Sequence, residues 1–197
     1  MIKVAVLVSG GGTNLQALID AEAVGAVAPG KLSLVVSNKP GVKALARAAK
    51  AGIPFAVCES AGVSQEEFEA SLTKILEENG IQIIVLAGFL KVLSRDFVKK
   101  YDRRIINVHP SLIPSFCGDG FYGLKVHEAA LEKGVKVTGA TVHYVNEITD
   151  GGEIILQKAV SVCKNDTPET LQRRVMEQAE WKLLPKALKK VCSEYDK

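Results

Sequence analysis

Asn107 and His109 are the pair of residues whose types and spacing best suit chemistry. They end a short apolar run that begins at Ile105, and the loop Pro110–Pro114 follows them. Side chains two residues apart on a strand point to the same face, so the amide and the imidazole should lie together. The amide donates hydrogen bonds without charge, and the imidazole titrates near neutral pH. The pair suits a reaction through a tetrahedral oxyanion, which needs a donor for the charge and a proton carrier.

Asp150 is a candidate third member of this group. It belongs to Thr149–Gly152, between two predicted strands, and an acidic residue before two glycines is first of all a turn signal. A carboxylate facing His109 would orient the ring, favour its protonated form and raise its pKa. The sequence alone leaves both interpretations open.

Three consecutive glycines, Gly10–Gly12, lie between the first predicted strand and the first predicted helix. Such a loop lets the backbone approach a ligand, and the helix N-terminus attracts anions. It is a poor dinucleotide fingerprint, because Leu15 stands where a third glycine is needed and Ser37-Asn38 end the second strand without an acid. No Gly-Lys-Ser/Thr follows either. We therefore predict a phosphomonoester site, with a ligand-free turn as the alternative.

The elements that must position these residues alternate between strand and helix. Unbroken apolar runs are typical of strands buried on both faces of a parallel sheet. They occur at Val4–Val8, Leu32–Val36, Ile81–Leu86 and Ile105–Val108, with a weaker strand at Phe55–Val57 and two longer ones at Val137–Val145 and Ile154–Val162. We predict an α/β fold: a single Rossmann-like domain over residues 1–197, with a mostly parallel central sheet of about seven strands, helices on both faces and an antiparallel C-terminal strand.

Helix signals fill the gaps between these strands. Helical spacing or caps mark 14–23, 42–51, a helix capped by Ser64, one from Ser94 to Tyr101, and 126–132. Thr167-Pro168-Glu169 starts the last helix, whose apolar stripe we expect to be interrupted at Pro185.

Composition excludes several classes of protein. The 197 residues carry a net charge of only +3 with no dense basic cluster, so nucleic acid is not an expected partner. No stretch is long enough to span a bilayer, and the N-terminal apolar run is too short for a signal peptide. The four cysteines lack the spacing of a zinc or redox motif, so we expect reduced structural thiols and a cytoplasmic location.

Four motifs occur in one order along the chain: Ser9-Gly-Gly-Gly-Thr-Asn-Leu, Leu86-Ala-Gly-Phe-Leu, Asn107-Val-His-Pro-Ser-Leu-Ile-Pro and Thr149-Asp-Gly-Gly. Together they resemble the phosphoribosylglycinamide formyltransferases of purine synthesis, over nearly the whole chain. The Asn-x-His-Pro-Ser-Leu block is shared with other folate-dependent formyltransferases, so it indicates the chemistry more than the acceptor. The glycine loop and the length favour the glycinamide ribonucleotide enzymes over methionyl-tRNA formyltransferase or formyltetrahydrofolate hydrolase, which carry an added domain.

The resemblance implies a reaction and a role for each candidate catalytic residue. The primary amine of glycinamide ribonucleotide would attack the formyl carbon of the co-substrate 10-formyltetrahydrofolate. Asn107 would donate to the oxyanion, His109 as imidazolium would stabilise it and protonate the leaving N10, and Asp150 would position His109. No metal is expected, because the formyl group is already an activated acyl group.

The resemblance also implies binding residues. Gly12, Thr13 and Asn14 would bind the ribonucleotide phosphate through backbone N–H groups, and Glu180 would contact the ribose, a solvated helix acid being the alternative. The folate site maps onto Leu90, Lys91, Val92, Leu93, Asn107, Asn146, Glu147, Thr149 and Asp150. The plainer interpretation of Leu90, Val92 and Leu93 is ordinary core. We therefore expect residues up to about 100 to form the ribonucleotide side and residues from about 101 to form the catalytic and folate side.

Several positions depart from the pattern of the family. Gln65 replaces an Arg near the folate tail, Cys117 replaces a Pro or Lys, and the loop Gly118–Val126 is longer than in many relatives. His143 lies on a predicted strand, which leaves an approach to the site open. For both His127 and His143 we favour structural roles, since most histidines outside a catalytic cluster serve packing or surface roles.

Other functions stay open at this point. A hydrolase could use the same Asn, His and Asp with water in place of the amine. Another amine could be the acceptor, or the chain could be a non-catalytic folate or sugar-phosphate binding module. The sequence leaves monomer and homodimer equally open.

Overall fold

A seven-stranded sheet forms the centre of the fold in the computed structural model, which describes residues 1–195. The strands are β1 (Ile2–Val8), β2 (Gly30–Ser37), β3 (Phe55–Val57), β4 (Ile83–Leu86), β5 (Ile105–His109), β6 (Val137–Tyr144) and β7 (Ile154–Ser161), in the order β3-β2-β1-β4-β5-β6-β7. The first five strands are parallel, whereas β6 is antiparallel to β5 and β7 to β6. The predicted α/β sheet with an antiparallel C-terminal end is confirmed.

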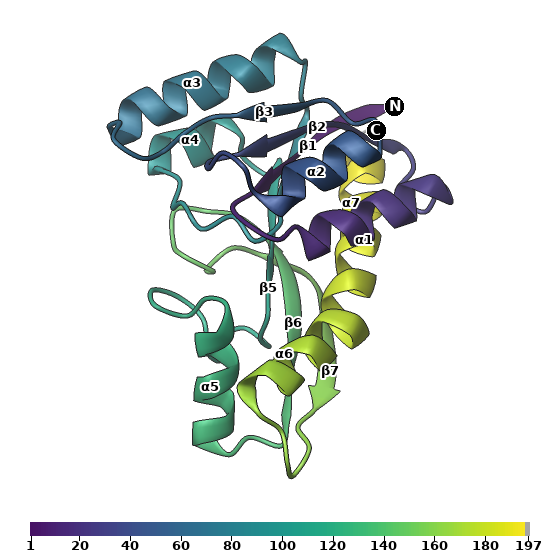
Figure 1. Cartoon of the computed structure of the whole chain (residues 1–197), viewed down its shortest axis with the longest axis vertical. Helices are drawn as coiled ribbons and strands as arrows, with labels where there is room; N and C mark the ends of the chain where they lie inside the picture. The colour runs from purple at the N-terminus through teal and green to yellow at the C-terminus, as the bar shows by residue number, and fades with distance from the viewer. Residues whose placement is uncertain (196–197) are drawn as a thin grey trace.

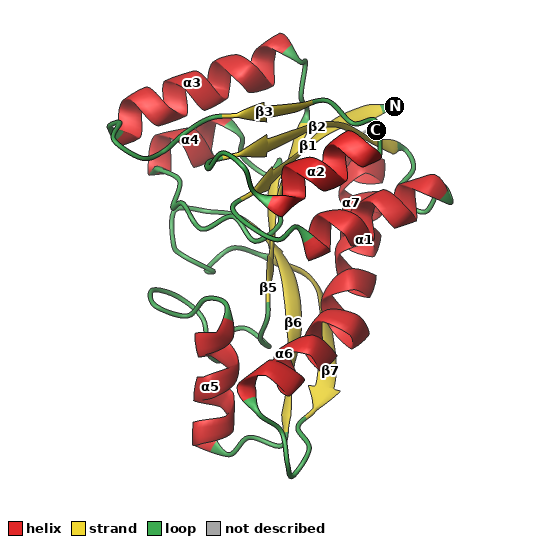
Figure 2. Cartoon of the chain, viewed as in Figure 1, coloured by secondary structure: helices red, strands yellow, loops and turns green. Residues whose placement is uncertain are grey.

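Helices cover both faces of this sheet (Figure 2). They are α1 (Thr13–Ala23), α2 (Lys43–Lys50), α3 (Gln65–Glu78), α4 (Arg95–Lys100), α5 (Leu124–Lys133), α6 (Pro168–Val175) and α7 (Trp181–Tyr195). Helices α1, α2 and α7 belong to one core, and α3 and α4 belong to the other. Within residues 1–195, no helix has the length and hydropathy needed to cross a membrane.

Alternation along β1 explains why the apolar runs are unbroken. Val4 and Val6 lie in the core that includes α7, whereas Ala5 and Leu7 lie in the core that includes α3. Both faces of the strand are therefore dry, and each face requires apolar side chains.

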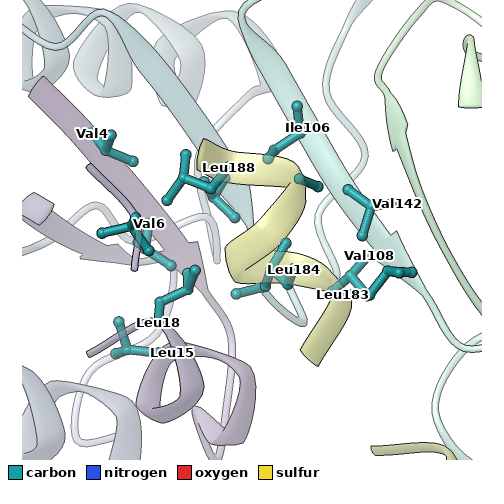
Figure 3. Packing of buried hydrophobic residues seen from close by; sticks show 14 of the residues in the cluster. Val4, Val6, Leu15, Leu18, Ile106, Val108, Val142, Leu183, Leu184 and Leu188 are labelled. Atoms are coloured by element: carbon teal, nitrogen blue, oxygen red, sulfur yellow. The ribbon is translucent and has the colours of Figure 1, made fainter. Parts of the chain in front are cut away.

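Helix α7 joins the two ends of the sheet. Leu183, Leu184 and Leu188 pack between β1 on one side and Val108 and Val142 on the other (Figure 3). Each such leucine stabilises the fold by about 1.5–3 kcal/mol through removal of apolar surface from water. The packing fixes the C-terminal strands, shown at the lower end of Figure 1, against the N-terminal half of the sheet.

The expected interruption at Pro185 is wrong. Pro185 lies inside the continuous helix Trp181–Tyr195 and is buried. The irregularity comes earlier, as a π-helical turn at Met176–Glu180 between α6 and α7. A proline removes one backbone hydrogen bond, and here the burial of Leu184 and Leu188 on the same helix outweighs that loss.

The sheet order places a switch point beside β1. Strand β1 is followed across the sheet by β2 on one side and by β4 on the other. In such sheets the loops at the carboxyl ends diverge at this point and leave a crevice, where ligands bind. The glycine loop after β1, the segment after β4 and His109 at the end of β5 share this edge.

Candidate active site

The structure brings Asn107, His109 and Asp150 together. Asn107 and His109 belong to β5, and Asp150 reaches them from the turn between β6 and β7. His109 Nδ1 lies 3.5 Å from Asp150 Oδ2, and both side chains are almost entirely removed from solvent. The turn therefore places its carboxylate against the imidazole.

Asp150 is held by unusual backbone geometry and by a loop. Its φ of 54° is in the left-handed region, which Asp enters more readily than most residues. The backbone N–H of Gly118 donates to Asp150 Oδ2 at 2.9 Å. Burial raises the pKa of Asp150, but hydrogen bonding, including that from the Gly118 N–H, and the nearby charge of His109 outweigh burial and hold that pKa below its usual value. The carboxylate is therefore ionised at neutral pH.

His109 faces an acceptor at each ring nitrogen. Its Nε2 lies 2.8 Å from the carbonyl oxygen of Phe116, which cannot donate, so Nε2 carries a proton. Its Nδ1 faces the Asp150 carboxylate. A neutral ring would leave one of these acceptors without a proton, whereas the imidazolium satisfies both. The geometry therefore favours charged His109.

His143 also belongs to this cluster, against the expectation of a purely structural role. It pairs with Asn107 across β5 and β6. Its Nε2 lies 3.2 Å from Asn107 Nδ2 and 3.5 Å from Asp150 Oδ1. The sequence predicted a strand at His143, but only the register between β5 and β6 places it opposite Asn107.

His127 is different from the other two histidines. It is fully buried on α5, and neither ring nitrogen has a hydrogen-bond partner. Burial, followed by the charge of His109, lowers the pKa of His127 to about 4. The ring is therefore neutral and packs as part of the protein interior.

A cavity of about 570 Å³ opens in front of these side chains. Asn107, His109, His143 and Asp150 line one part of it. The remaining walls come from three segments, 86–93, 118–123 and 145–149. The volume is within the range of small-molecule sites, and the charged group meets an otherwise largely apolar wall.

Every residue predicted for the folate side lines this one cavity. Leu90 is 57% and Val92 is 67% exposed, so the ordinary-core interpretation is wrong for these two. Large apolar side chains standing in solvent at the wall of a cavity suit a flat, partly apolar ligand. Leu93 is partly buried and packs on the core under α3.

Gln65 stabilises the segment that carries Leu90 and Val92 through hydrogen bonds of its side chain. Its side-chain amide donates to the Val92 carbonyl at 3.0 Å and to Glu69 Oε1 at 2.7 Å. Gln65 thus supports the cavity wall. Lys91, whose ammonium lies 5.9 Å from the Phe68 ring centroid, is the nearby cation that lines the cavity.

The long loop after β5 contacts the site through its first half. Residues 118–123 line the cavity, and α5 begins at Leu124. Tyr122 is half exposed and lies beside the Lys125 ammonium. Burial, followed by the Asp150 charge, raises the pKa of the Cys117 thiol, so this thiol is protonated at neutral pH.

The glycine loop lies at the N-terminus of α1. Gly12 is the N-cap with a φ of 73°, and a Cβ there would come within 2.7 Å of the Ala44 Cβ. Gly10 and Gly11 have open space where a Cβ would stand. Packing thus requires Gly12, whereas Gly10 and Gly11 leave the backbone accessible to a ligand. The Arg47 guanidinium is anchored beside the loop by the Gly11 carbonyl at 2.9 Å.

Asn14 and Glu180 meet behind this loop. Asn14 Nδ2 donates to Glu180 Oε2 at 2.7 Å, and both residues are buried. The interpretation of Glu180 as a solvated helix acid is therefore wrong. Burial raises the pKa of Glu180 to about 7, although the bond from Asn14 lowers it. Asn14 Oδ1 is buried without a partner in the structure, which leaves one acceptor of this pair unsatisfied.

The two sides of the site are connected through Ser9. Its hydroxyl donates to Asn38 Oδ1 at 2.7 Å and accepts from the Leu90 backbone N–H at 2.9 Å. The glycine loop and the wall that carries Leu90 therefore share a buried hydrogen-bond network.

An Asn–His–Asp group at a cavity of an α/β sheet suits acyl-transfer chemistry, and a family match identifies the class of protein. Residues 2–188 match the model described as formyl transferase, so the chain belongs to the formyl transferase family.

The names of individual similar proteins are more specific. The chain is 40% identical over 190 residues to the phosphoribosylglycinamide formyltransferase of Haemophilus influenzae, covering 96% of this chain and 86% of the relative. It is 48% identical over 193 residues to the trifunctional purine biosynthetic protein adenosine-3 of Gallus gallus, but these 98% of the chain span only 18% of that relative. The crystal structure of glycinamide ribonucleotide transformylase 1 from Symbiobacterium toebii has a TM-score of 0.89 at 39% identity, covering 96% of this chain and 86% of that one.

Proposed function

We propose that this protein transfers the formyl group of 10-formyltetrahydrofolate to the primary amine of glycinamide ribonucleotide, giving formylglycinamide ribonucleotide and tetrahydrofolate in purine biosynthesis. The observation that carries the proposal is the convergence of Asn107, His109 and Asp150 at one wall of a 570 Å³ cavity. Membership of the formyl transferase family and the names of the relatives support the same reaction.

Each member of the group has one task in the reaction. The substrate amine attacks the formyl carbon, and the carbonyl oxygen becomes an oxyanion to which the Asn107 amide donates. As the bond to N10 breaks, the amine nitrogen loses one proton and N10 gains one, with His109 as the proton carrier. Asp150 keeps the ring oriented and charged.

The resting geometry adds a condition to this mechanism. Both N–H groups of charged His109 face protein acceptors, Phe116 and Asp150. Proton transfer to the substrate therefore requires His109 Nε2 to exchange the Phe116 carbonyl for the substrate. The Phe116 carbonyl belongs to the loop before residues 118–123, which line the cavity.

The folate and the ribonucleotide occupy the two connected sides of the site. The exposed apolar side chains of Leu90 and Val92, with Lys91 and Leu93, form one wall for the folate, and the turn with Asn146, Glu147 and Thr149 forms the facing wall for the pterin. Backbone N–H groups of Gly12, Thr13 and Asn14 bind the phosphate at the positive end of α1. Glu180, joined to Asn14, accepts from the ribose hydroxyls.

Further parts of the proposal concern the surroundings of the reaction. We propose a metal-free reaction, a monomer or homodimer, and a reducing cytoplasm. Cys58, Cys117 and Cys163 are unbridged thiols, which suits that compartment. The division of function at about residue 100 stays a prediction, and the cavity is lined from both halves.

The decisive experiment measures turnover of 10-formyltetrahydrofolate with and without glycinamide ribonucleotide. Transfer requires tetrahydrofolate and formylglycinamide ribonucleotide to accumulate in equal amounts, and only with the ribonucleotide present. Formate release without an acceptor would assign a hydrolase, and turnover with other primary amines would assign a different acceptor. A binding module would show no turnover, so His109→Ala would have no activity to abolish.

A further inference from the structure

The hydrogen bonds of His143 define which of its ring nitrogens carries the proton. Nδ1 lies 2.8 Å from the Tyr144 carbonyl oxygen, which only accepts, so Nδ1 is protonated. Nε2 lies 3.2 Å from the Asn107 amide nitrogen, which only donates, so Nε2 offers a lone pair. A single species satisfies both contacts, namely the neutral ring with its proton on Nδ1.

Asp150 competes with Asn107 for the same ring nitrogen. Asp150 Oδ1 lies 3.5 Å from His143 Nε2, and a carboxylate would require Nε2 to carry a proton. In that state Nε2–H would face the amide N–H groups of Asn107, and the amide would have to turn over to present its oxygen. The contact to Asn107 is the shorter one, and the negative charge of Asp150 is already compensated at Oδ2, which accepts from the Gly118 N–H and faces His109.

We propose that neutral His143, protonated on Nδ1, is a positioning residue that fixes the orientation of the Asn107 amide. One amide N–H binds His143 Nε2, which leaves the second N–H for the cavity that Asn107 lines. The inference rests on the proposed function, because it gives Asn107 the oxyanion. The two histidines then have different roles. His109 is the cation, and His143 stays neutral so that the Asn107 amide can donate to its Nε2 and to the oxyanion.

Two variants of nearly equal polarity separate this role from mere packing. Asn keeps an amide donor near the Nδ1 position for the Tyr144 carbonyl but has no atom at the Nε2 position. Gln reaches the Nε2 position and supplies an oxygen there. We expect His143→Asn to lower kcat roughly ten- to hundredfold with little change in either KM, because a buried donor of the amide loses its acceptor. We expect His143→Gln to restore most of that loss.

A double-mutant cycle tests whether His143 acts through Asn107. In an Asn107→Ala background, His143→Asn should cause no further loss of kcat, because there is no amide left to orient. An equal fold-loss in both backgrounds would overturn the positioning role while leaving the proposed function intact. A wild-type kcat for Asn107→Ala would overturn the oxyanion role and the positioning role together.

The tautomer can be measured on the unmodified protein, independently of activity and of variant folding. Nitrogen NMR of histidine-labelled protein at pH 7.5 distinguishes protonated from unprotonated ring nitrogens. We expect one histidine with Nδ1 protonated and Nε2 bare, assigned to His143 by its loss in His143→Gln. A signal for His143 with Nε2 protonated would overturn the inference.

Discussion

Glu180→Gln should change how the stability of the protein depends on pH. Burial raises the pKa of Glu180 from 4.5 to about 7, so the folded state holds a proton that the unfolded chain has already released. The stability contributed by that proton is fully present below pH 4.5 and is lost as the pH rises through 7. A glutamine has nearly the same shape and still accepts from Asn14, but it does not titrate.

The structure sets the size of the effect. Each tenfold change in proton affinity corresponds to about 1.36 kcal/mol, so a pKa moved from 4.5 to about 7 corresponds to about 3 kcal/mol. Glu180 is buried, so solvent does not screen this energy. The free energy of unfolding of Glu180→Gln should therefore rise relative to the wild type by about 3 kcal/mol between pH 4.5 and pH 8.

Urea unfolding of the ligand-free protein at several pH values measures this difference. Glu177→Gln is the matched control, because Glu177 lies in the same π-helical turn but is exposed. The control should differ from the wild type by less than about 0.5 kcal/mol at every pH. Parallel stability curves for the wild type and Glu180→Gln would refute the argument that Glu180 is a protonated buried acid.

Four further substitutions test the candidate site and the glycine loop. Asn107→Ala should lower kcat by about 10²–10³-fold with smaller changes in substrate Kd, the cost of one oxyanion donor, and an unchanged kcat in steady-state kinetics would contradict that role. Asp150→Asn should also lower kcat by orders of magnitude, because a neutral amide cannot be the anionic partner of His109 Nδ1, and a wild-type kcat in steady-state kinetics would contradict that role. Gly12→Val should lower the unfolding midpoint, because Gly12 has a left-handed φ and a Cβ there would meet Ala44. Gly11→Ala should keep that midpoint. It should weaken ribonucleotide binding, measured by calorimetry, but not folate binding. Equal loss of both ligands in Gly11→Ala would point to misfolding instead.

The sheet was predictable because burial leaves a direct trace in the sequence. Val4–Val8 of β1 and the whole of β4 are buried on both faces of the sheet, so each of these positions must be apolar and the run is unbroken. Helix starts were predictable for a similar local reason, since Ser64 and Thr167 both form capping boxes. Pro185 was misjudged because helix propensity is local, whereas the burial of α7 is decided by the whole core.

The candidate site was only partly predictable. Asn107 and His109 share a strand, so their proximity follows from local geometry. The partnership of His143 with Asn107 depends on the register between β5 and β6, which no local pattern specifies. Phe116 and Gly118 take part through backbone groups, and main-chain atoms leave no signature in residue type.

The contact between the Phe116 carbonyl and His109 describes the site when no substrate is bound. The Phe116 carbonyl accepts the hydrogen bond from His109 Nε2 in the absence of substrate, so the loop that carries Phe116 occupies the position of the reacting molecule. Phe116 has a φ of 51°, which a bulky side chain rarely adopts, so the backbone at this position is strained. In the proposed mechanism, binding of the formyl donor and movement of this loop away from His109 occur as one exchange. Until the donor binds, the Phe116 carbonyl shields the His109 imidazolium from water.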